Sequence, residues 1–369
     1  MTTSTVLTTT PRFIAPAHPL VGPDERAAVE SVLRSGALAQ GAEVAAFEAE
    51  FAEVVDGREC VAVNSGTSAL HLGMLAAGIG LGDEVIVPSF TFAATANAVA
   101  LCGATPVFAD IDPETYCLDP AHVGSVITAR TAAIMPVHLF GQPAPMAELV
   151  ALGQRHGLAV FEDACQAHLA TLDGTPAGAF GDVAAFSFYP TKNMTTGEGG
   201  MVVCADPVVA RRVRLLRNQG MEKRYANELV GFNTRMTEMA AAMGRVQLRR
   251  LPGFTATRRH NAALLSEGLA RVSAPVVRPG AAHVYHQFTV RAPERDRVVE
   301  ALQADGIGVG VYYPTPVHRL PAYSEDLDLP VTAVAAAEVL SLPVHPALLP
   351  DEIDRIISAT NSAIERLGR

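Results

Sequence analysis

The sequence has 369 residues, of which 49% are hydrophobic and 18% are charged, and this composition excludes a mainly disordered chain. Its 28 Lys and Arg residues are outnumbered by 38 Asp and Glu, and the net charge of −10 argues against broad binding to nucleic acid or to anionic membranes. The length suits two domains, or one large domain with an appendage.

The chain begins with a polar, Thr-rich stretch of ten residues that lacks the basic start and apolar core of a signal peptide. The five cysteines form no CxxC pair, so we expect reduced thiols, a cytoplasmic protein and no metal site. The most apolar stretch, 90–108, is interrupted by Thr95, Asn97 and Gly103. It therefore predicts no membrane span.

Between Cys60 and Cys204, short β-branched runs alternate with longer helical patterns. This alternation predicts an α/β fold with a mostly parallel sheet, and the continuous apolar character of the strands indicates helices on both faces. We expect strands at 85–87, 106–110, 132–138, 158–162, 183–188 and 201–204, and helices at 67–77, 93–101 and 146–156.

Beyond Asp206 no new parallel strand follows directly. Helical patterns cover 206–217, 237–251, 258–269, 295–304, 331–340 and 351–367, and strand patterns cover 287–290 and 309–313. We therefore predict a large domain over 1–254, with an N-terminal arm over 1–25, and a smaller α+β domain over 255–369. The segment 11–21 is expected to fold back on the C-terminal part.

The turn Asn64-Ser-Gly-Thr67 leads from a short strand into a helix. Unpaired N–H groups at such a helix start can bind an anion. The hydroxyls of Thr67 and Ser68 would add donors, or they would only cap the helix. The turn lacks the P-loop and dinucleotide-binding motifs, so both interpretations stay open on this segment alone.

Glu162 and Asp163 stand at the carboxyl end of an apolar strand, where open α/β sheets bind their ligands. A carboxylate there needs a cationic partner, or Asp163 caps the following segment. Gln166 and His168 are equally ambiguous, and we interpret His168 as a supporting residue at most.

Lys192 follows an apolar strand by a few residues and precedes a Gly-rich turn. Desolvation in such a setting lowers the pKa of a lysine and makes its amine nucleophilic, as Schiff-base chemistry requires. The ordinary alternative is a surface lysine beside a turn. Only one other lysine, Lys223, occurs in the chain, and the scarcity of lysine and the apolar neighbours favour a functional Lys192.

In their order along the chain these segments resemble the DegT-type sugar aminotransferases, which are pyridoxal-phosphate (PLP) enzymes of the aspartate aminotransferase fold, fold type I. The resemblance extends over nearly the whole chain, and its motifs lie at 36–41, 64–67, 82–86, 88–92, 162–168, 186–192, 231–236 and 312–318. It implies a mostly parallel, seven-stranded sheet flanked by helices, with a smaller α+β C-terminal domain. A dehydratase branch of the family has His in place of the lysine, so Lys192 predicts transamination.

The resemblance also implies roles for single residues. Lys192 would form the Schiff base with PLP and move the proton between the substrate carbon and the cofactor, and Asp163 would pair with the pyridine nitrogen. The remaining cofactor contacts would be Gly66, Thr67, Ser68 and Ser187 at the phosphate, Phe92 on the ring face, Gln166 near the ring oxygen, and Asn233 at the phosphate of a neighbouring subunit. Tyr313 and His318 are candidate sugar contacts. The active site would then be shared in a homodimer.

The predicted reaction moves an amino group from glutamate or glutamine to a keto group of a nucleotide-linked deoxysugar, in the biosynthesis of an amino sugar. Two alternatives remain. One is a PLP-binding regulator or accessory subunit without turnover. The other is a fold-type I enzyme acting on simple amino acids, for which Arg235 would bind the substrate carboxylate.

Overall fold

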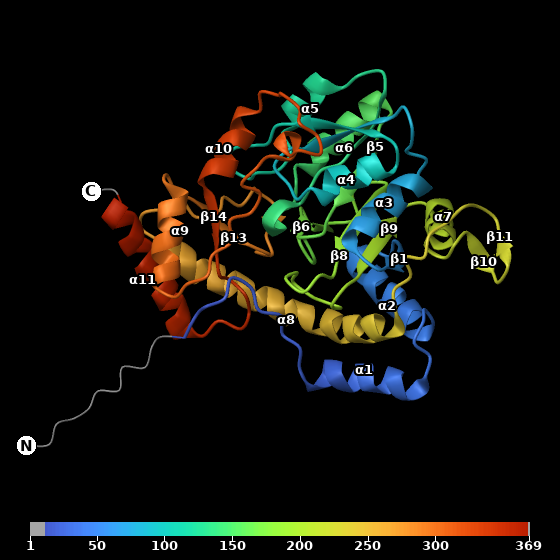
Figure 1. Ribbon diagram of the computed structural model, residues 1–369, viewed down its shortest axis with the longest axis horizontal. Helices are drawn as coiled ribbons and strands as arrows, with labels where there is room; N and C mark the ends of the chain where they lie inside the picture. Colours follow the sequence, from blue (N-terminus) through green and yellow to red (C-terminus); the bar gives the residue numbers. More distant parts are fainter. Residues whose placement is uncertain (1–11, 368–369) are drawn as a thin grey trace, which may run out of the picture.

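The computed structural model describes residues 12–367. At its centre lies a seven-stranded sheet with the strand order β1-β9-β8-β5-β4-β2-β3 (Figure 1). Its strands are β1 Glu59–Val63, β2 Glu84–Pro88, β3 Thr105–Ala109, β4 Thr131–Ile134, β5 Ala159–Asp163, β8 Val183–Ser187 and β9 Gly200–Cys204. β9 runs antiparallel to β1 and β8, whereas the other neighbours pair in parallel. The predicted mostly parallel sheet is confirmed.

Helices cover both faces of this sheet. One face packs against α3 Gly66–Ala76, α4 Ala94–Leu101 and α7 Pro207–Arg217, and the other against α2 Ala42–Ala52, α5 Pro120–Val126, α6 Met146–His156 and the first part of α8 Glu238–Gly268. Alternate residues of β1 show why its whole run is apolar. Val61 and Val63 join the core on the α3 side, whereas Cys60 and Ala62 join the core on the α2 side.

The C-terminal part has a core of its own around a two-stranded antiparallel sheet, β13 Phe288–Arg291 and β14 Val339–Leu342. α9 Arg295–Ala304, α11 Pro350–Leu367 and the end of α8 pack on this core. The two helices predicted at 237–251 and 258–269 are one continuous helix, α8, with Pro252 inside it. The predicted domain boundary at 254/255 therefore falls in the middle of a helix.

The second strand of this small sheet also differs from the prediction. The segment 309–313 forms no strand apart from a single bridge between Gly310 and Ser341, and β13 pairs with β14 instead. The helix expected to reach residue 340 ends earlier, since α10 spans Pro330–Glu338. All four residues of β14 are buried, and a short apolar run of this kind does not distinguish a strand from a buried helix end.

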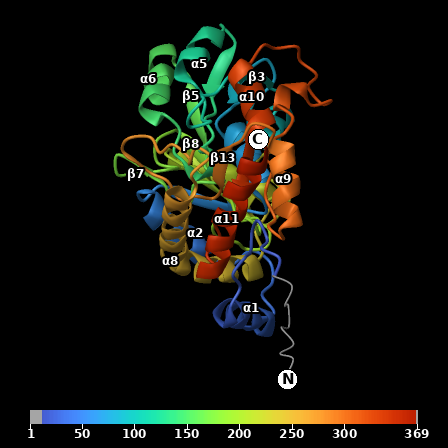
Figure 2. The ribbon, with the colours of Figure 1, turned by 90° about the vertical axis from the view of Figure 1, so that its left-hand side faces the viewer.

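The N-terminal arm folds back on the C-terminal part within the described residues, as predicted. Ile14 pairs with Ile307, and its backbone N–H and C=O bond to Gly306 and Gly308. Pro11 and the Thr-rich start of the chain lie outside the described residues. α1 Pro23–Ser35 then packs along α8, at the end of the molecule opposite α5 and α6 (Figure 2).

Short elements complete the chain. They are the 3₁₀ turns η1 Glu53–Val55, η2 Leu139–Gly141 and η3 Val317–Arg319, the strands β6 Thr171–Leu172, β7 Thr175–Pro176 and β12 Ala281–Ala282 of a small sheet, and the hairpin of β10 Met221–Lys223 and β11 Ala226–Asn227. This hairpin projects beyond α7 (Figure 1). Over residues 12–367, no helix combines the length and the hydropathy needed to cross a bilayer.

Candidate active site

A cavity of about 440 Å³ lies where the parallel strands end. Asp163 is the last residue of β5, Ser187 is the last residue of β8, and Gly66 opens α3 just after β1. The C-terminal part closes the opposite side with His286, Gln287, Tyr312 and Tyr313. The carboxyl edge of the sheet, which the sequence indicated as the ligand site, thus faces an open space between two parts of the chain.

Lys192 and Asp163 both face this cavity. Burial lowers the pKa of Lys192, although Cys165 and Asp163 nearby act in the opposite direction. The Asp163 carboxylate accepts hydrogen bonds from the Thr95 hydroxyl (2.8 Å) and from the Cys165 backbone N–H (3.2 Å). The capping role considered for Asp163 accounts for the second of these bonds alone. Because both residues line the same cavity, the Lys192 amine and the Asp163 carboxylate can contact one ligand.

The start of α3 forms the floor of the cavity beside Ser187. Ser65 caps the helix, because its Oγ accepts a hydrogen bond from Ser68 N–H (3.1 Å). The N–H groups of Gly66 and Thr67 precede the first intrahelical bonds and have no helical acceptor. A Cβ on Gly66 would lie 2.7 Å from Cβ of Ser187, so glycine allows this close approach of α3 to β8. Gly66, Thr67 and Ser187 line the cavity, whereas Ser68 does not.

Gln166 connects the two sides of the cavity. Its Oε1 accepts from Phe140 N–H (2.7 Å), and its Nε2 donates to the hydroxyl of Tyr313 (2.8 Å). Phe140 and Tyr313 both have left-handed backbones, with φ of 58° and 59°. Such conformations are strained for aromatic residues, and Gln166 bonds to the backbone of the first and to the side-chain hydroxyl of the second. Phe92, predicted to stack on the ring, also lines the cavity, and 62% of its surface is exposed.

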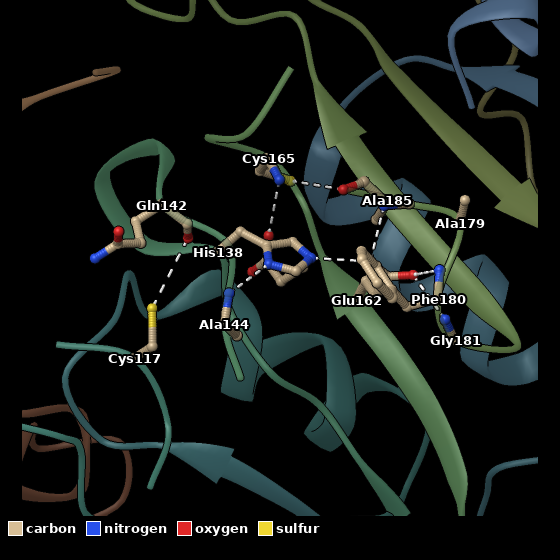
Figure 3. A network of polar contacts seen from close by, with 12 residues as sticks. Cys117, His138, Gln142, Ala144, Glu162, Cys165, Ala179, Phe180, Gly181 and Ala185 are labelled. Carbon is tan, nitrogen blue, oxygen red and sulfur yellow. Dashed lines mark hydrogen bonds and ion pairs between the residues drawn. The ribbon is translucent and has the colours of Figure 1, made fainter. Parts of the chain in front are cut away.

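Glu162 points away from Asp163, because successive side chains of a strand face opposite sides of the sheet. Its fully buried carboxylate accepts hydrogen bonds from His138 Nε2 (2.9 Å) and from the N–H groups of Phe180 and Gly181 (2.8 Å each), as Figure 3 shows. It also accepts a hydrogen bond from the N–H of Gly178 (2.8 Å). His138 Nδ1 accepts from Ala144 N–H (2.9 Å), so Nε2 carries the ring proton. The sequence placed Glu162 and Asp163 together at the ligand edge. The structure brings Asp163 alone to the cavity.

Besides Ser68 and Glu162, four candidate residues lie outside the cavity lining. His168 is packed between Phe186 and Phe188, and burial lowers its pKa to about 3, so it is neutral. The Nδ1 of His318 lies 2.6 Å from the hydroxyl of Ser89, in the buried interior. Asn233 is exposed ahead of α8, and Arg235 donates a hydrogen bond to Asn218 (2.8 Å). The contacts predicted for His318 and Asn233 therefore stay predictions.

Several lining residues were not predicted from the sequence. Thr91 and Thr95 reach the cavity from the segment after β2, and His286 and Gln287 reach it from the C-terminal part. Of the two threonines, only Thr91 lies in a motif noted in the sequence, the one at 88–92, and nothing in the sequence pointed to Thr95. Gln287 was predicted merely as the first residue of a strand.

An amine and a carboxylate that face one cavity at the carboxyl edge of a mostly parallel sheet, beside an open helix N-terminus, define the site of a fold type I, PLP-dependent transferase. The residues fit this cofactor, since they offer a lysine for its aldehyde, a carboxylate for its ring nitrogen, and free N–H groups beside Gly66 for its phosphate. The chain belongs to the DegT/DnrJ/EryC1/StrS aminotransferase family, whose sequence profile matches residues 19–361.

Individual relatives agree with this family over most of their length. The Erythromycin biosynthesis sensory transduction protein EryC1 of Saccharopolyspora erythraea is 45% identical, over 90% of this chain and 93% of its own. The dTDP-3-amino-3,4,6-trideoxy-alpha-D-glucose transaminase of Streptomyces venezuelae is 44% identical, over 93% of each chain. The crystal structure of S. venezuelae DesV in complex with a ketimine intermediate has a TM-score of 0.90 at 44% identity, over 93% of this chain and 94% of its own. The predicted fold class, family, enzyme class and cofactor are confirmed.

Proposed function

We propose that this chain transfers an amino group from glutamate or glutamine to a keto group of a nucleotide-linked deoxysugar, in amino-sugar biosynthesis. The observation that carries the proposal is the joint position of Lys192 and Asp163 on one cavity of about 440 Å³. A relative of 44% identity is named as a dTDP-aminosugar transaminase, which supports a nucleotide sugar as the acceptor.

The chain's own residues divide the work at this cavity. When bound, pyridoxal phosphate supplies an electron sink for the breaking of a C–H bond next to nitrogen. Lys192, which burial favours in its neutral form, would bind the aldehyde carbon and later carry a proton on Nζ to and from the substrate carbon. Asp163 would keep the ring nitrogen protonated. Gly66 and Thr67 N–H groups and the Ser187 hydroxyl would hold the phosphate.

The two rims of the cavity suit the remaining contacts. Phe92 would cover the ring face, and the free N–H of Gln166 would reach the ring oxygen, because its other polar positions are already bonded to Phe140 and Tyr313. The Tyr313 hydroxyl accepts from Gln166 and keeps its own proton, so it would donate a hydrogen bond to the sugar. His318 would shape the same rim through Ser89, which begins the loop that carries Phe92.

We further propose that the site is completed in a homodimer. Among the described residues that line the cavity, Lys192 is the only Lys or Arg, and Asp163 and Glu198 are acidic. The cofactor phosphate, the nucleotide diphosphate and the donor carboxylates are all anions, so a single chain leaves them short of donors. Asn233, exposed beside the exposed Phe232, would supply one donor to the phosphate of the partner's site. The five free thiols suit a reducing cytoplasm.

A regulator without turnover is the second candidate, because EryC1 is named a sensory transduction protein. Lys192 and Asp163 on one cavity favour turnover. An enzyme for simple amino acids is favoured less, since Arg235 is bonded to Asn218 and does not line the cavity.

Two half-reactions followed by absorbance test the proposal. Glutamate or glutamine added to the yellow holoenzyme should bleach it, and a nucleotide-linked ketosugar should then restore the colour. Lys192→Ala is the matched control and should do neither. A wild-type enzyme that neither donor bleaches would support the regulator instead, and one that simple keto acids restore but no ketosugar does would contradict the proposed acceptor.

A further inference from the structure

Two buried threonines lead to the Asp163 carboxylate from a distant part of the chain. The Thr95 hydroxyl donates to Oδ2 of Asp163 (2.8 Å), and the hydroxyls of Thr91 and Thr95 are 3.1 Å apart. Thr91 is 2% exposed, Thr95 1% and Asp163 6%, so water competes little for these bonds. The three side chains form one buried chain of polar groups at the cavity wall.

The direction of this chain follows from its protons. A threonine hydroxyl has one proton to donate, and that of Thr95 goes to the carboxylate. The contact between the two hydroxyls is then a bond that Thr91 donates and Thr95 accepts. Each donor polarises the next group, which strengthens the bond to the ionised oxygen.

The hydroxyls of Thr91 and Thr95 do not cap helix α4, which begins in this segment. α4 begins after Ala93, and no side chain caps it. The backbone N–H of Thr95 bonds to the carbonyl of Phe92 (3.1 Å), whereas its hydroxyl reaches across to β5.

We propose that Thr95 is a positioning residue that orients the Asp163 carboxylate for its task at the cofactor ring, with Thr91 as the donor behind it. The inference rests on the role proposed for Asp163. Cys165 N–H fixes one carboxylate oxygen and Thr95 fixes the other, so the carboxylate plane is held and its remaining lone pairs stay free for the ring nitrogen. Without the Thr95 hydroxyl, the carboxylate keeps one donor and can rotate away from the ring nitrogen, and this loss of orientation weakens its hold on the ring proton.

The test compares Thr95→Val, which keeps the shape, with Thr95→Ser, which keeps the hydroxyl. The readout is the pH at which the ring nitrogen of bound, isotope-labelled pyridoxal phosphate loses its proton, followed by nitrogen NMR. We expect a lower pH for Thr95→Val, a smaller fall for Thr91→Val and a near-normal value for Thr95→Ser. The kcat of Thr95→Val should fall about ten- to a hundred-fold, as for loss of a hydrogen bond to a charged group, with little change in KM.

Thr289→Val is a matched control, because it removes another buried threonine hydroxyl, which bonds to Ser341 in the C-terminal sheet (2.8 Å). It should lower stability and leave the ring titration unchanged. A wild-type titration and kcat in Thr95→Val would overturn the proposal. If Thr95→Val fails to fold, Thr91→Val decides, and an unchanged titration there overturns the proposed chain of donors.

Asp163→Asn separates this inference from the proposed function. If Asp163→Asn leaves the ring nitrogen protonated, the role proposed for Asp163 is wrong, and the role of Thr95 with it. If Asp163→Asn removes the proton but Thr95→Val does not shift it, the role of Thr95 alone is wrong.

Discussion

The two lysines of the chain, Lys192 and Lys223, have the same side chain but different surroundings. Burial lowers the pKa of Lys192, whereas Lys223 is exposed on the hairpin of β10 and β11. A lowered pKa leaves a larger share of the amine unprotonated at neutral pH, and the unprotonated amine is the nucleophile. A half-buried lysine at the cavity wall therefore has the reactivity that the proposed reaction needs.

This difference predicts which lysine carries the cofactor. Borohydride reduction of the holoenzyme should attach the pyridoxyl group to Lys192 alone, and peptide mapping by mass spectrometry identifies the position. Lys223→Arg should be labelled to the same extent as the wild type, and Lys192→Ala should not be labelled. A pyridoxyl group on Lys223 in the wild type would contradict the assignment.

The tight packing of Gly66 against Ser187 predicts the effect of a single added methyl group. An added methyl group would meet Ser187 at 2.7 Å, so Gly66→Ala must push α3 away from β8 and displace the N–H groups that we propose hold the phosphate. We expect the affinity for pyridoxal phosphate to fall at least tenfold, measured by fluorescence titration of the apoenzyme. Gly253→Ala, in open space on α8, is the control and should bind as the wild type. Normal affinity in Gly66→Ala would place the phosphate elsewhere.

Among the elements, β5 carries two carboxylates with opposite tasks. Asp163 faces the cavity, and Glu162 on the other side ties the loop of Gly178, Phe180 and Gly181 to His138. The backbone N–H of His138 also bonds to the carbonyl of Asp163 (3.0 Å). The Glu162 network thus braces the strand end from which Asp163 projects.

Replacing Glu162 by Gln should destabilise the protein by about 3 kcal/mol, because the new amide group turns a donor toward N–H groups in a buried site. Burial raises the pKa of Glu162, but hydrogen bonds from His138, Gly181 and Gly178 outweigh it and lower the pKa below its ordinary value. The carboxylate therefore stabilises the fold above its unfolded pKa, and this contribution is lost as the pH falls through the folded pKa.

Denaturant unfolding at several pH values checks this expectation. The gap between wild type and Glu162→Gln should be widest at neutral pH and should narrow in acid. Glu53→Gln, at an exposed position of η1, should show no gap at any pH. A gap that does not change with pH would argue that lost packing, rather than the charge, is responsible.

Sequence patterns predicted the elements of the parallel sheet well, because strands covered on both faces are continuous apolar runs. They could not predict what tertiary contacts decide. The break predicted between residues 251 and 258 is absent, because buried Leu251 and Thr255 on either side of Pro252 keep the helix continuous. Likewise, the hydrogen bond from Thr95 to Asp163 joins residues 68 positions apart, and no local sequence pattern predicts it.

The proposed sharing of the active site between two subunits can be tested with two inactive variants. If Asn233 acts across a dimer interface, Lys192→Ala and Asn233→Ala subunits should form heterodimers in which one site carries both lesions and the other carries neither. Activity should reappear on mixing, approaching half the wild-type value per heterodimer.

The control pair is Lys192→Ala with Asp163→Asn, whose positions line the same cavity. Each site then keeps one defect, and mixing should restore nothing. Recovery in neither pair, or a fully active monomer by light scattering, would place Asn233 outside the partner's site.

The length of α8 has a consequence for cooperativity. Its 31 residues extend about 46 Å, and it buries Leu248 and Leu251 in the core beneath the large sheet and Ala262 and Leu265 in the C-terminal core. Division of the chain after residue 254 would cut this helix and leave an exposed apolar stripe on both fragments, 1–254 and 255–369. Neither fragment, expressed alone, should therefore be obtained as a folded product. The holoenzyme should unfold in one calorimetric transition, because α8 contributes to both hydrophobic cores and its unfolding disrupts both of them.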